Sequence, residues 1–334
     1  MKTNHLYICL FFIIISGCND KKETEIPINT HNRTIIVYLG RDNSDLHQEW
    51  EDKKEAMISG WNGNNGNLII FEDLKDHGAS MSEVRKNNGT IHITELEISD
   101  IGDNSADPEV FSSVIKKIIT LYPADSYGLI VFFHGTGWLP KGTFESPRSI
   151  IKDNESEMEI SDFASALPDN LKLDFIIFEA CLMAGIEVVY ELRDKADYIL
   201  ASAAEIVSPG FKSIYKNYMD HLFLPNADLY RFSAEAFDYF NTQTGSWQSG
   251  TLSLIRTSDI YEMGQWLKNN INREKIGSVD IDDIQQFDRR ASNHLYYDFE
   301  DFFSRILTEG ARKEILHSFL DKCIEYKAST PYFF

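Results

Sequence analysis

The sequence has few cysteines, little glycine or proline, and a deficit of basic side chains. Of its 334 residues, 4 are cysteine, 19 are glycine and 9 are proline, while 43% are hydrophobic. This composition excludes a collagen-like or low-complexity chain and is typical of a globular protein. The 32 Lys and Arg are outnumbered by 52 Asp and Glu, which gives a formal net charge of −20. Sequence-independent nucleic-acid binding needs clustered basic side chains against phosphate, so we predict that nucleic acid is not a partner.

The cysteines are too few and too scattered for a disulfide framework. Cys9 and Cys18 lie in the N-terminal segment, whereas Cys181 and Cys323 lie in the body of the chain. The sequence contains no CxxC pair, which argues against a zinc site or a dithiol redox site.

Several motifs of common enzyme classes are also missing. The sequence has no HExxH, no G-x-S-x-G, no Walker A loop and no G-x-G-x-x-G. Asp280, Asp282 and Asp283 could bind calcium, but they lack the ligand spacing of an EF-hand, and a solvated face is the favoured interpretation. We therefore expect that no cofactor is required, with calcium as a weakly supported alternative.

An apolar run near the N-terminus is too short to cross a membrane as a helix. Lys2 precedes the run Leu10–Ile15, which is followed by Ser16, Gly17 and Cys18. A basic start, a short apolar stretch and small residues before a cleavage point are typical of a secretory signal. The stretch ending in Cys18 resembles the bacterial lipobox, so residues 1–17 are predicted to be a lipoprotein signal peptide. An ordinary signal peptide with a chance cysteine is the alternative.

Lipidation of Cys18 would anchor the chain, since each buried methylene of an acyl chain such as palmitate contributes about 0.8 kcal/mol. Residues 18–33 are polar and lack apolar periodicity, so they are predicted to be a flexible tether. The acidic residues close to Cys18 resemble the export tethers of Bacteroidetes surface lipoproteins. We therefore expect a lipid anchor in a bacterial envelope membrane, with the outer membrane and a surface-exposed protein favoured over a periplasm-facing anchor.

The body alternates short apolar runs with amphipathic segments. Such alternation predicts an α/β fold: a mainly parallel sheet flanked by helices on both faces. The predicted core covers residues 34–215, and a helix-rich C-terminal part, residues 216–334, is expected to pack on it. The predicted strands are 34–39, 68–71, 90–96, 128–133, 173–178, 198–202 and 251–255, and the predicted helices are 46–57, 108–118, 161–167, 181–193 and 311–326.

A histidine and a cysteine follow the two strongest predicted strands. The run Leu129–Phe133 ends in His134, and the run Phe175–Phe178 ends in Glu179, Ala180 and Cys181. Ligands bind beyond the carboxyl ends of parallel strands, and neighbouring strands lie about 4.8 Å apart. If the two strands are neighbours in the sheet, these side chains can form a nucleophile and an acid/base. The alternative is a cysteine that packs as a small buried hydrophobe and a histidine that is a core residue. A helix that starts at Cys181 would also lower the pKa of its thiol through the helix dipole.

The same residues resemble known cysteine peptidases. His134 precedes Cys181 by 47 residues, similar to the spacing of about 50 in caspases. The closer resemblance, spread over residues 34–215, is to the clostripain family of the caspase-like clan. It rests on Thr34–Leu39 with Asp42-Asn43, on His134-Gly135-Thr136-Gly137-Trp138, on Ala180-Cys181-Leu182-Met183 with Glu187, and on Ala201-Ser202 through Pro209-Gly210-Phe211.

The resemblance implies a caspase-like fold and a cysteine endopeptidase that cleaves protein or peptide substrates after Arg or Lys. It gives His134 the role of general acid/base and Cys181 that of nucleophile, with the N–H groups of Gly135 and Cys181 as the oxyanion hole.

For substrate binding it implies Glu179, Ser202 and Glu205. Glu179 replaces the Asp common in the family, and an orienting role at the strand end is its alternative. A non-catalytic surface lipoprotein that uses the same scaffold for binding is the alternative function.

Overall fold

The computed structural model describes residues 32–42, 47–74, 77–140, 151–153, 156–288, 294–307 and 309–334. The predicted signal peptide, Cys18 and the tether up to residue 31 lie outside the described residues. Residues His31–Phe334 form one compact unit. Within the part that the structure describes, no helix is both long enough and apolar enough to cross a membrane.

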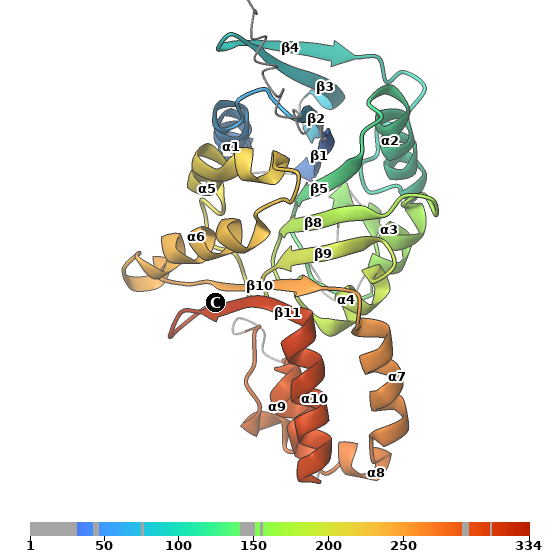
Figure 1. Ribbon diagram of the computed structural model, residues 1–334, viewed down its shortest axis with the longest axis vertical. Helices are drawn as coiled ribbons and strands as arrows, with labels where there is room; N and C mark the ends of the chain where they lie inside the picture. Colours follow the sequence, from blue (N-terminus) through green and yellow to red (C-terminus); the bar gives the residue numbers. More distant parts are fainter. Residues whose placement is uncertain are drawn as a thin grey trace, which may run out of the picture. The chain divides into compact units, whose positions relative to one another are not determined.

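A nine-stranded sheet runs through this unit in the order β11-β10-β9-β8-β5-β1-β2-β3-β4 (Figure 1). The pairs from β9 through β8, β5 and β1 to β2 are parallel, and the pairs at both ends are antiparallel. The strands are β1 Arg33–Asp42, β2 Gly66–Leu74, β3 Gly78–Asn87, β4 Thr90–Leu96, β5 Ser126–Phe132, β8 Leu173–Glu179, β9 Ala196–Ala201, β10 Thr251–Arg256 and β11 Ile324–Ser329.

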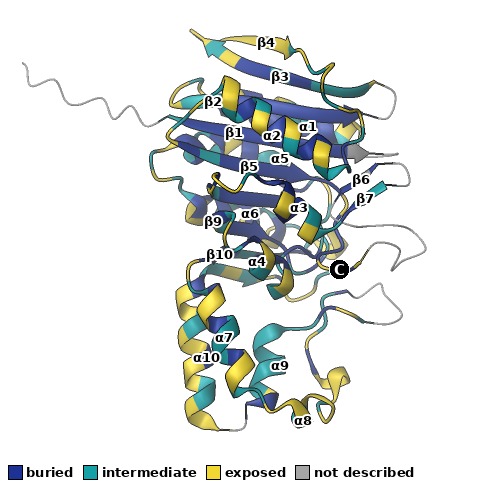
Figure 2. Cartoon of the chain, turned by 90° about the vertical axis from the view of Figure 1, so that its right-hand side faces the viewer, coloured by how far each residue is buried: buried dark blue, intermediate teal, exposed yellow. Residues whose placement is uncertain are grey.

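Helices cover both faces of this sheet. Alternate residues of β1 divide between two cores: Ile35 and Val37 pack with one set of helices, Ile36 and Tyr38 with the other. Because β1 lies in the middle of the sheet, both of its faces are buried, which explains its continuous apolar sequence. One face carries α1 His47–Gly60, α5 Lys212–Tyr218 and α6 Leu229–Asn241; the other carries α2 Pro108–Leu121, α3 Ile160–Ala166 and α4 Ile186–Leu192 (Figures 1 and 2).

The C-terminal part contributes two strands to the same sheet. β10 pairs with β9, and β11 pairs with β10, so the sheet continues into residues beyond 215. The helices of this part include α7 Ile260–Asn270, α8 Arg273–Ile276, α9 Phe299–Ile306 and α10 Gly310–Cys323. The predicted α/β architecture with a mainly parallel sheet and helices on both faces is confirmed.

Three details differ from the sequence prediction. The predicted helix 311–326 ends at Cys323, because residues 324–329 pair with β10 as an edge strand. β3 is an additional strand that pairs with both β2 and β4. The turn Asn88-Gly89, with positive φ at both residues, connects β3 to β4, as is usual for a two-residue hairpin. A small hairpin, β6 Ile151–Asp153 and β7 Ser156–Met158, lies between β5 and α3, where no strand was predicted.

Gly60 fixes how closely α1 approaches α5. A Cβ at Gly60 would lie 2.1 Å from the carbonyl oxygen of Tyr215. We predict that Gly60→Ala lowers the free energy of unfolding by about 1–3 kcal/mol, because α1 must move away from α5. The matched control is Gly277→Ala at the end of α8, where a Cβ has no neighbour within 4 Å. Urea denaturation of both variants checks this; equal stabilities would contradict it.

Candidate active site

The sheet places His134 and Cys181 beside each other. β5 and β8 are parallel neighbours, and Phe132 pairs in register with Glu179. His134 lies two residues beyond Phe132 and Cys181 two residues beyond Glu179, so both extend from the same level of the sheet. The adjacency of the two strands, on which the proposed pairing of these side chains depends, is present. His134 is exposed and Cys181 half-buried, so both are accessible from outside the core.

The backbone after His134 lies against the backbone of the cysteine. Gly135 is buried, and a Cβ on it would lie 2.5 Å from the carbonyl oxygen of Cys181. A Cβ on Gly137, whose φ is +60°, would lie 2.6 Å from the carbonyl oxygen of Leu182. The glycines of the His-Gly-Thr-Gly sequence thus permit close packing of the two loops that carry the candidate dyad.

The loop after Cys181 is a tight turn and not a helix. Leu182 has a φ of +63°, which is rare for a residue with a side chain. Its N–H donates to the carbonyl of Ala204 at 3.1 Å, and the N–H of Ala184 donates to Ser202 at 2.9 Å. α4 begins only at Ile186. The prediction that a helix starts at Cys181 is therefore wrong, and the helix dipole does not account for thiolate formation.

The segment after β9 forms a wall beside the thiol. The N–H of Ile206 points to the Sγ of Cys181 at 3.4 Å, and the N–H of Glu205 donates to the carbonyl of Phe334 at 3.1 Å. Glu205 is half-buried. Ser202, in contrast, is fully buried: its hydroxyl donates to the Ala204 carbonyl and bonds the hydroxyl of Thr251 at 2.8 Å. Ser202 thus holds the wall in shape, which corrects the expectation that its side chain contacts substrate.

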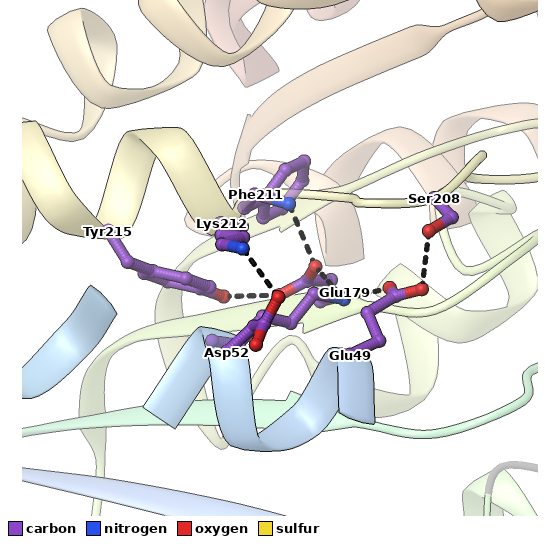
Figure 3. A network of polar contacts seen from close by, with 8 residues as sticks. Glu49, Asp52, Glu179, Ser208, Phe211, Lys212 and Tyr215 are labelled. Atoms are coloured by element: carbon purple, nitrogen blue, oxygen red, sulfur yellow. Dashed lines mark hydrogen bonds and ion pairs between the residues drawn. The ribbon is translucent and has the colours of Figure 1, made fainter. Parts of the chain in front are cut away.

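Glu179 is enclosed by the protein (Figure 3). Its Oε1 accepts the N–H of Phe211 at 2.8 Å and pairs with the Nζ of Lys53 at 2.6 Å, while its Oε2 accepts the hydroxyl of Tyr215 at 2.7 Å. The side chains of Glu179 and Lys53 are each only 1% exposed. This geometry corrects the substrate-binding role expected for Glu179, because its charge is already compensated. The arrangement instead fits the alternative of an orienting role.

Glu49, one turn before Lys53 on α1, connects this buried pair to the wall. Its carboxylate pairs with Lys53 at 2.6 Å and accepts the hydroxyl of Ser208 at 2.5 Å (Figure 3). Burial raises the pKa of Glu49, but the Lys53 charge, the hydrogen bonds from Lys53 and Ser208, and the nearby His134 lower it below its usual value overall. The carboxylate therefore stays ionised near the candidate dyad.

Sequence reasoning missed Lys53 and Glu49. Trp50, Lys53 and Met57 are all buried and recur at helical spacing on α1. A lysine on the apolar stripe of a helix signals a buried partner, but nothing near it in the sequence identifies Glu179 as that partner.

A small apolar cluster joins the loops that follow His134 and Cys181 to the C-terminal part. Leu139, Leu182 and Tyr296 pack together, with Cys181 and Phe287 against them. The hydroxyl of Tyr296 donates to the carbonyl of Thr136, in the histidine loop.

Metal ligation was a weak expectation at the aspartates near residue 280. Asp280 accepts the N–H of Asp282 at 3.1 Å through its side chain. Across the described ranges, no group of three or more His, Cys, Asp and Glu side chains could together hold a metal ion.

The Lys53–Glu179 pair generates a stability prediction. Lys53→Met leaves an uncompensated buried carboxylate, so we expect a loss of about 3–5 kcal/mol in the free energy of unfolding. Adding Glu179→Gln removes that charge, and the double variant should be more stable than Lys53→Met alone. Lys212→Met, which removes a solvent-exposed pair with Asp52, is the control and should change stability little. Urea denaturation measures all three; a Lys53→Met variant as stable as Lys212→Met would refute the buried-pair interpretation.

Comparisons with known proteins agree with this geometry. The clostripain family model matches residues 37–327. Clostripain of Hathewaya histolytica is 28% identical over 233 residues, which cover 58% of this chain and 44% of that protein. The chain therefore matches less than half the length of this relative.

Solved structures of similar proteins, two C11 proteases among them, match nearly the whole chain. An inactive zymogen of a C11 protease from Parabacteroides distasonis shares 31% identity with a TM-score of 0.79, covering 90% of this chain and 84% of the other. A secreted C11 cysteine protease from Bacteroides thetaiotaomicron, in complex with an irreversible peptide inhibitor, shares 25% identity with a TM-score of 0.75, covering 90% and 85%. The resemblance predicted from sequence is confirmed: this chain belongs to the clostripain family of cysteine peptidases.

Proposed function

We propose that the protein is a cysteine endopeptidase in which Cys181 is the nucleophile and His134 the general acid/base. The observation that carries this proposal is the register of β5 and β8, which extends both residues from the same level of two neighbouring strands. Membership of a peptidase family and the accessibility of both side chains support it.

The chemistry follows from the two side chains. His134 takes the thiol proton of Cys181, and the thiolate attacks the carbonyl carbon of the scissile peptide bond. The N–H groups of Gly135 and Cys181 donate to the oxyanion, a contribution of about 3–4 kcal/mol for each donor in comparable enzymes. His134 then protonates the leaving amine, which leaves an acyl group on Cys181. Finally His134 takes a proton from water, the hydroxide attacks the acyl carbon, and the carboxylic acid product and the thiol are released.

We predict that Cys181→Ala and His134→Ala each reduce kcat for peptide cleavage by about a thousandfold or more, since residues of one catalytic unit act together. The matched control is Cys323→Ala. Burial raises the pKa of the Cys323 thiol to about 11, so this thiol stays protonated at neutral pH. Cleavage of a quenched fluorescent peptide by each variant, with and without a chelator, measures the effect.

Near-normal turnover by either dyad variant would refute the mechanism. A wild type that binds peptides without cleaving them would favour the alternative of a non-catalytic binding lipoprotein. The proposal includes no cofactor, so the chelator should leave turnover unchanged. A loss of turnover in the presence of the chelator would favour the calcium alternative.

We further propose that cleavage follows Arg or Lys, with Glu205 as the acidic determinant. Glu205 is half-buried in the wall next to Ile206, whose N–H faces the thiol. The side chain of Glu179, in contrast, is only 1% exposed and is closed off from a substrate. A carboxylate near the cleft would pair with a guanidinium or ammonium of the substrate.

Glu205→Gln should lower kcat/KM for substrates with Arg or Lys before the scissile bond by about tenfold, the effect of roughly 1.4 kcal/mol. Matched substrates with norleucine at that position should be cleaved equally by wild type and variant. Glu95→Gln, on the exposed strand β4, is the control. A wild type that prefers norleucine over both basic residues would rule out this specificity.

The lipid anchor is a separate proposal, supported by the sequence around Cys18 alone. We expect that metabolic labelling with a palmitate analogue modifies the wild type and that Cys18→Ser moves the protein from the membrane to the soluble fraction. Digestion of intact cells with an added protease then distinguishes surface exposure on the outer membrane from a periplasm-facing anchor. A Cys18→Ser protein that stays unlabelled yet membrane-bound would show a different anchor.

A further inference from the structure

A cavity of about 860 Å³ opens among the loops that carry the candidate dyad. Trp138 comes from the histidine loop, Leu182 follows the nucleophile, and Ala203 belongs to the wall after β9; all three line the cavity. Its far side is formed by α7, α9 and α10 of the C-terminal part. We call this cavity the aromatic pocket. Its volume lies within the range of about 300–1,000 Å³ that is usual for ligand sites.

The inner wall of the aromatic pocket is apolar and incompletely covered. Phe299, Phe302 and Phe303 of α9 all line it, and each is only half-buried. Figure 2 shows much of α9 in the colour of intermediate burial. The one fully buried residue of α9 is Ile306. Tyr190 and Leu295 line the same space. Large apolar side chains around an unfilled concave space favour an apolar ligand, because its burial removes their surface from water.

Carboxylates lie at the rim of the pocket. Glu187 and Glu191, one turn apart on α4, both line it and are both exposed. On the C-terminal side, Glu300 pairs with Lys327 at 3.3 Å. Asp298 and Lys268 also line the pocket, so its lining holds four carboxylates and two ammonium groups. The rim on α4 therefore favours a positively charged group next to the apolar one.

We propose that the aromatic pocket is a substrate subsite that takes a bulky apolar or aromatic side chain of the peptide, with a basic residue beside it at the α4 rim. This inference rests on the proposed peptidase function and names a second determinant of its substrate class. Since Leu182 follows the nucleophile directly and an extended peptide advances about 3.3 Å per residue, the side chain concerned lies within a few residues of the scissile bond. Glu205 does not line the pocket, so the pocket takes a residue other than the one that Glu205 contacts.

The experiment uses the purified full chain and quenched peptides with Arg before the scissile bond and glycine elsewhere. Phe, Leu or Gly is placed in turn at each of the neighbouring positions on both sides. We expect one position at which Phe raises kcat/KM by about tenfold or more over Gly, as for apolar groups in specificity pockets. Phe302→Ala should remove most of that gain. Phe319→Ala is the matched control: Phe319 is a half-buried residue of α10 that packs against Trp266 at a tilt of 45°, and neither residue lines the pocket.

A second pair of variants tests the rim. In the wild type, a Lys placed next to the Phe should raise kcat/KM. The double variant Glu187→Gln/Glu191→Gln should reduce this gain in kcat/KM severalfold, and the difference from the wild type should become smaller at high salt. Glu262→Gln, exposed on α7 and outside the pocket lining, is the control. Leu295→Ala serves as a second pocket variant if thermal unfolding shows that Phe302→Ala is not folded.

A binding assay separates failure of the pocket from failure of the peptidase proposal. Cys181→Ala protein is titrated with fluorescently labelled Phe-containing and Gly-containing peptides, and anisotropy is measured. Suppose that the wild type cleaves no peptide, yet adding Phe302→Ala to the Cys181→Ala protein weakens binding of the Phe peptide about tenfold. The pocket assignment then stands, and the peptidase proposal fails. A preference for Phe at no position, or one that Phe302→Ala and Leu295→Ala leave intact, would overturn the pocket assignment.

Discussion

The buried ion pair between Lys53 and Glu179 is the contact on which the geometry of the candidate active site depends. It joins α1 to the carboxyl end of the cysteine strand, while the other contacts of Glu179 hold Phe211 and Tyr215. The carboxylate of Glu49 extends the network to Ser208 in the wall beside the thiol. Removing two charges from water is unfavourable unless each is well paired. The pairing of Lys53 with Glu179 therefore requires α1 and the carboxyl end of β8 to lie in contact. The network therefore positions the cysteine strand and the cleft wall relative to each other.

This network changes the role of the acid that precedes the cysteine. An aspartate or glutamate at the end of a strand is a natural partner for a substrate cation only where it faces solvent. Here Lys53 occupies the position that a substrate cation would take beside Glu179. Gly210, at a φ of +57°, allows the loop to close over this pair, since a Cβ there would lie 2.0 Å from the Oε1 of Glu179. The proposed selection of a basic substrate therefore requires a carboxylate other than that of Glu179.

The sequence predicted those features that depend on local patterns. Long apolar runs identified β1, β5 and β8, and the alternation with helices predicted a parallel sheet. His134 and Cys181 were expected to meet if β5 and β8 are neighbours, and the structure shows that they are. The patterns failed where the deciding contact is distant in sequence. By their local sequence, residues 324–326 were predicted to continue the helix that is now α10. In the structure residues 324–329 form a strand instead, because they pair with the edge of β10. Glu179 and Lys53 are 126 positions apart, and the walls of the aromatic pocket come from both halves of the chain. Only the packed fold brings such residues together.

The cleft depends on residues close to the C-terminus, and this dependence has a consequence while the chain is being synthesised. The wall residue Glu205 is bonded to Phe334, and Tyr296 holds the histidine loop through Thr136. A ribosome makes His134 and Cys181 long before these supports, and domains fold as their residues emerge. A nascent chain that has both catalytic candidates but not yet α9, α10 and β11 lacks part of the wall and one side of the pocket. The cleft proposed to bind peptide is therefore complete only once the C-terminal residues have folded against the loops that follow His134 and Cys181.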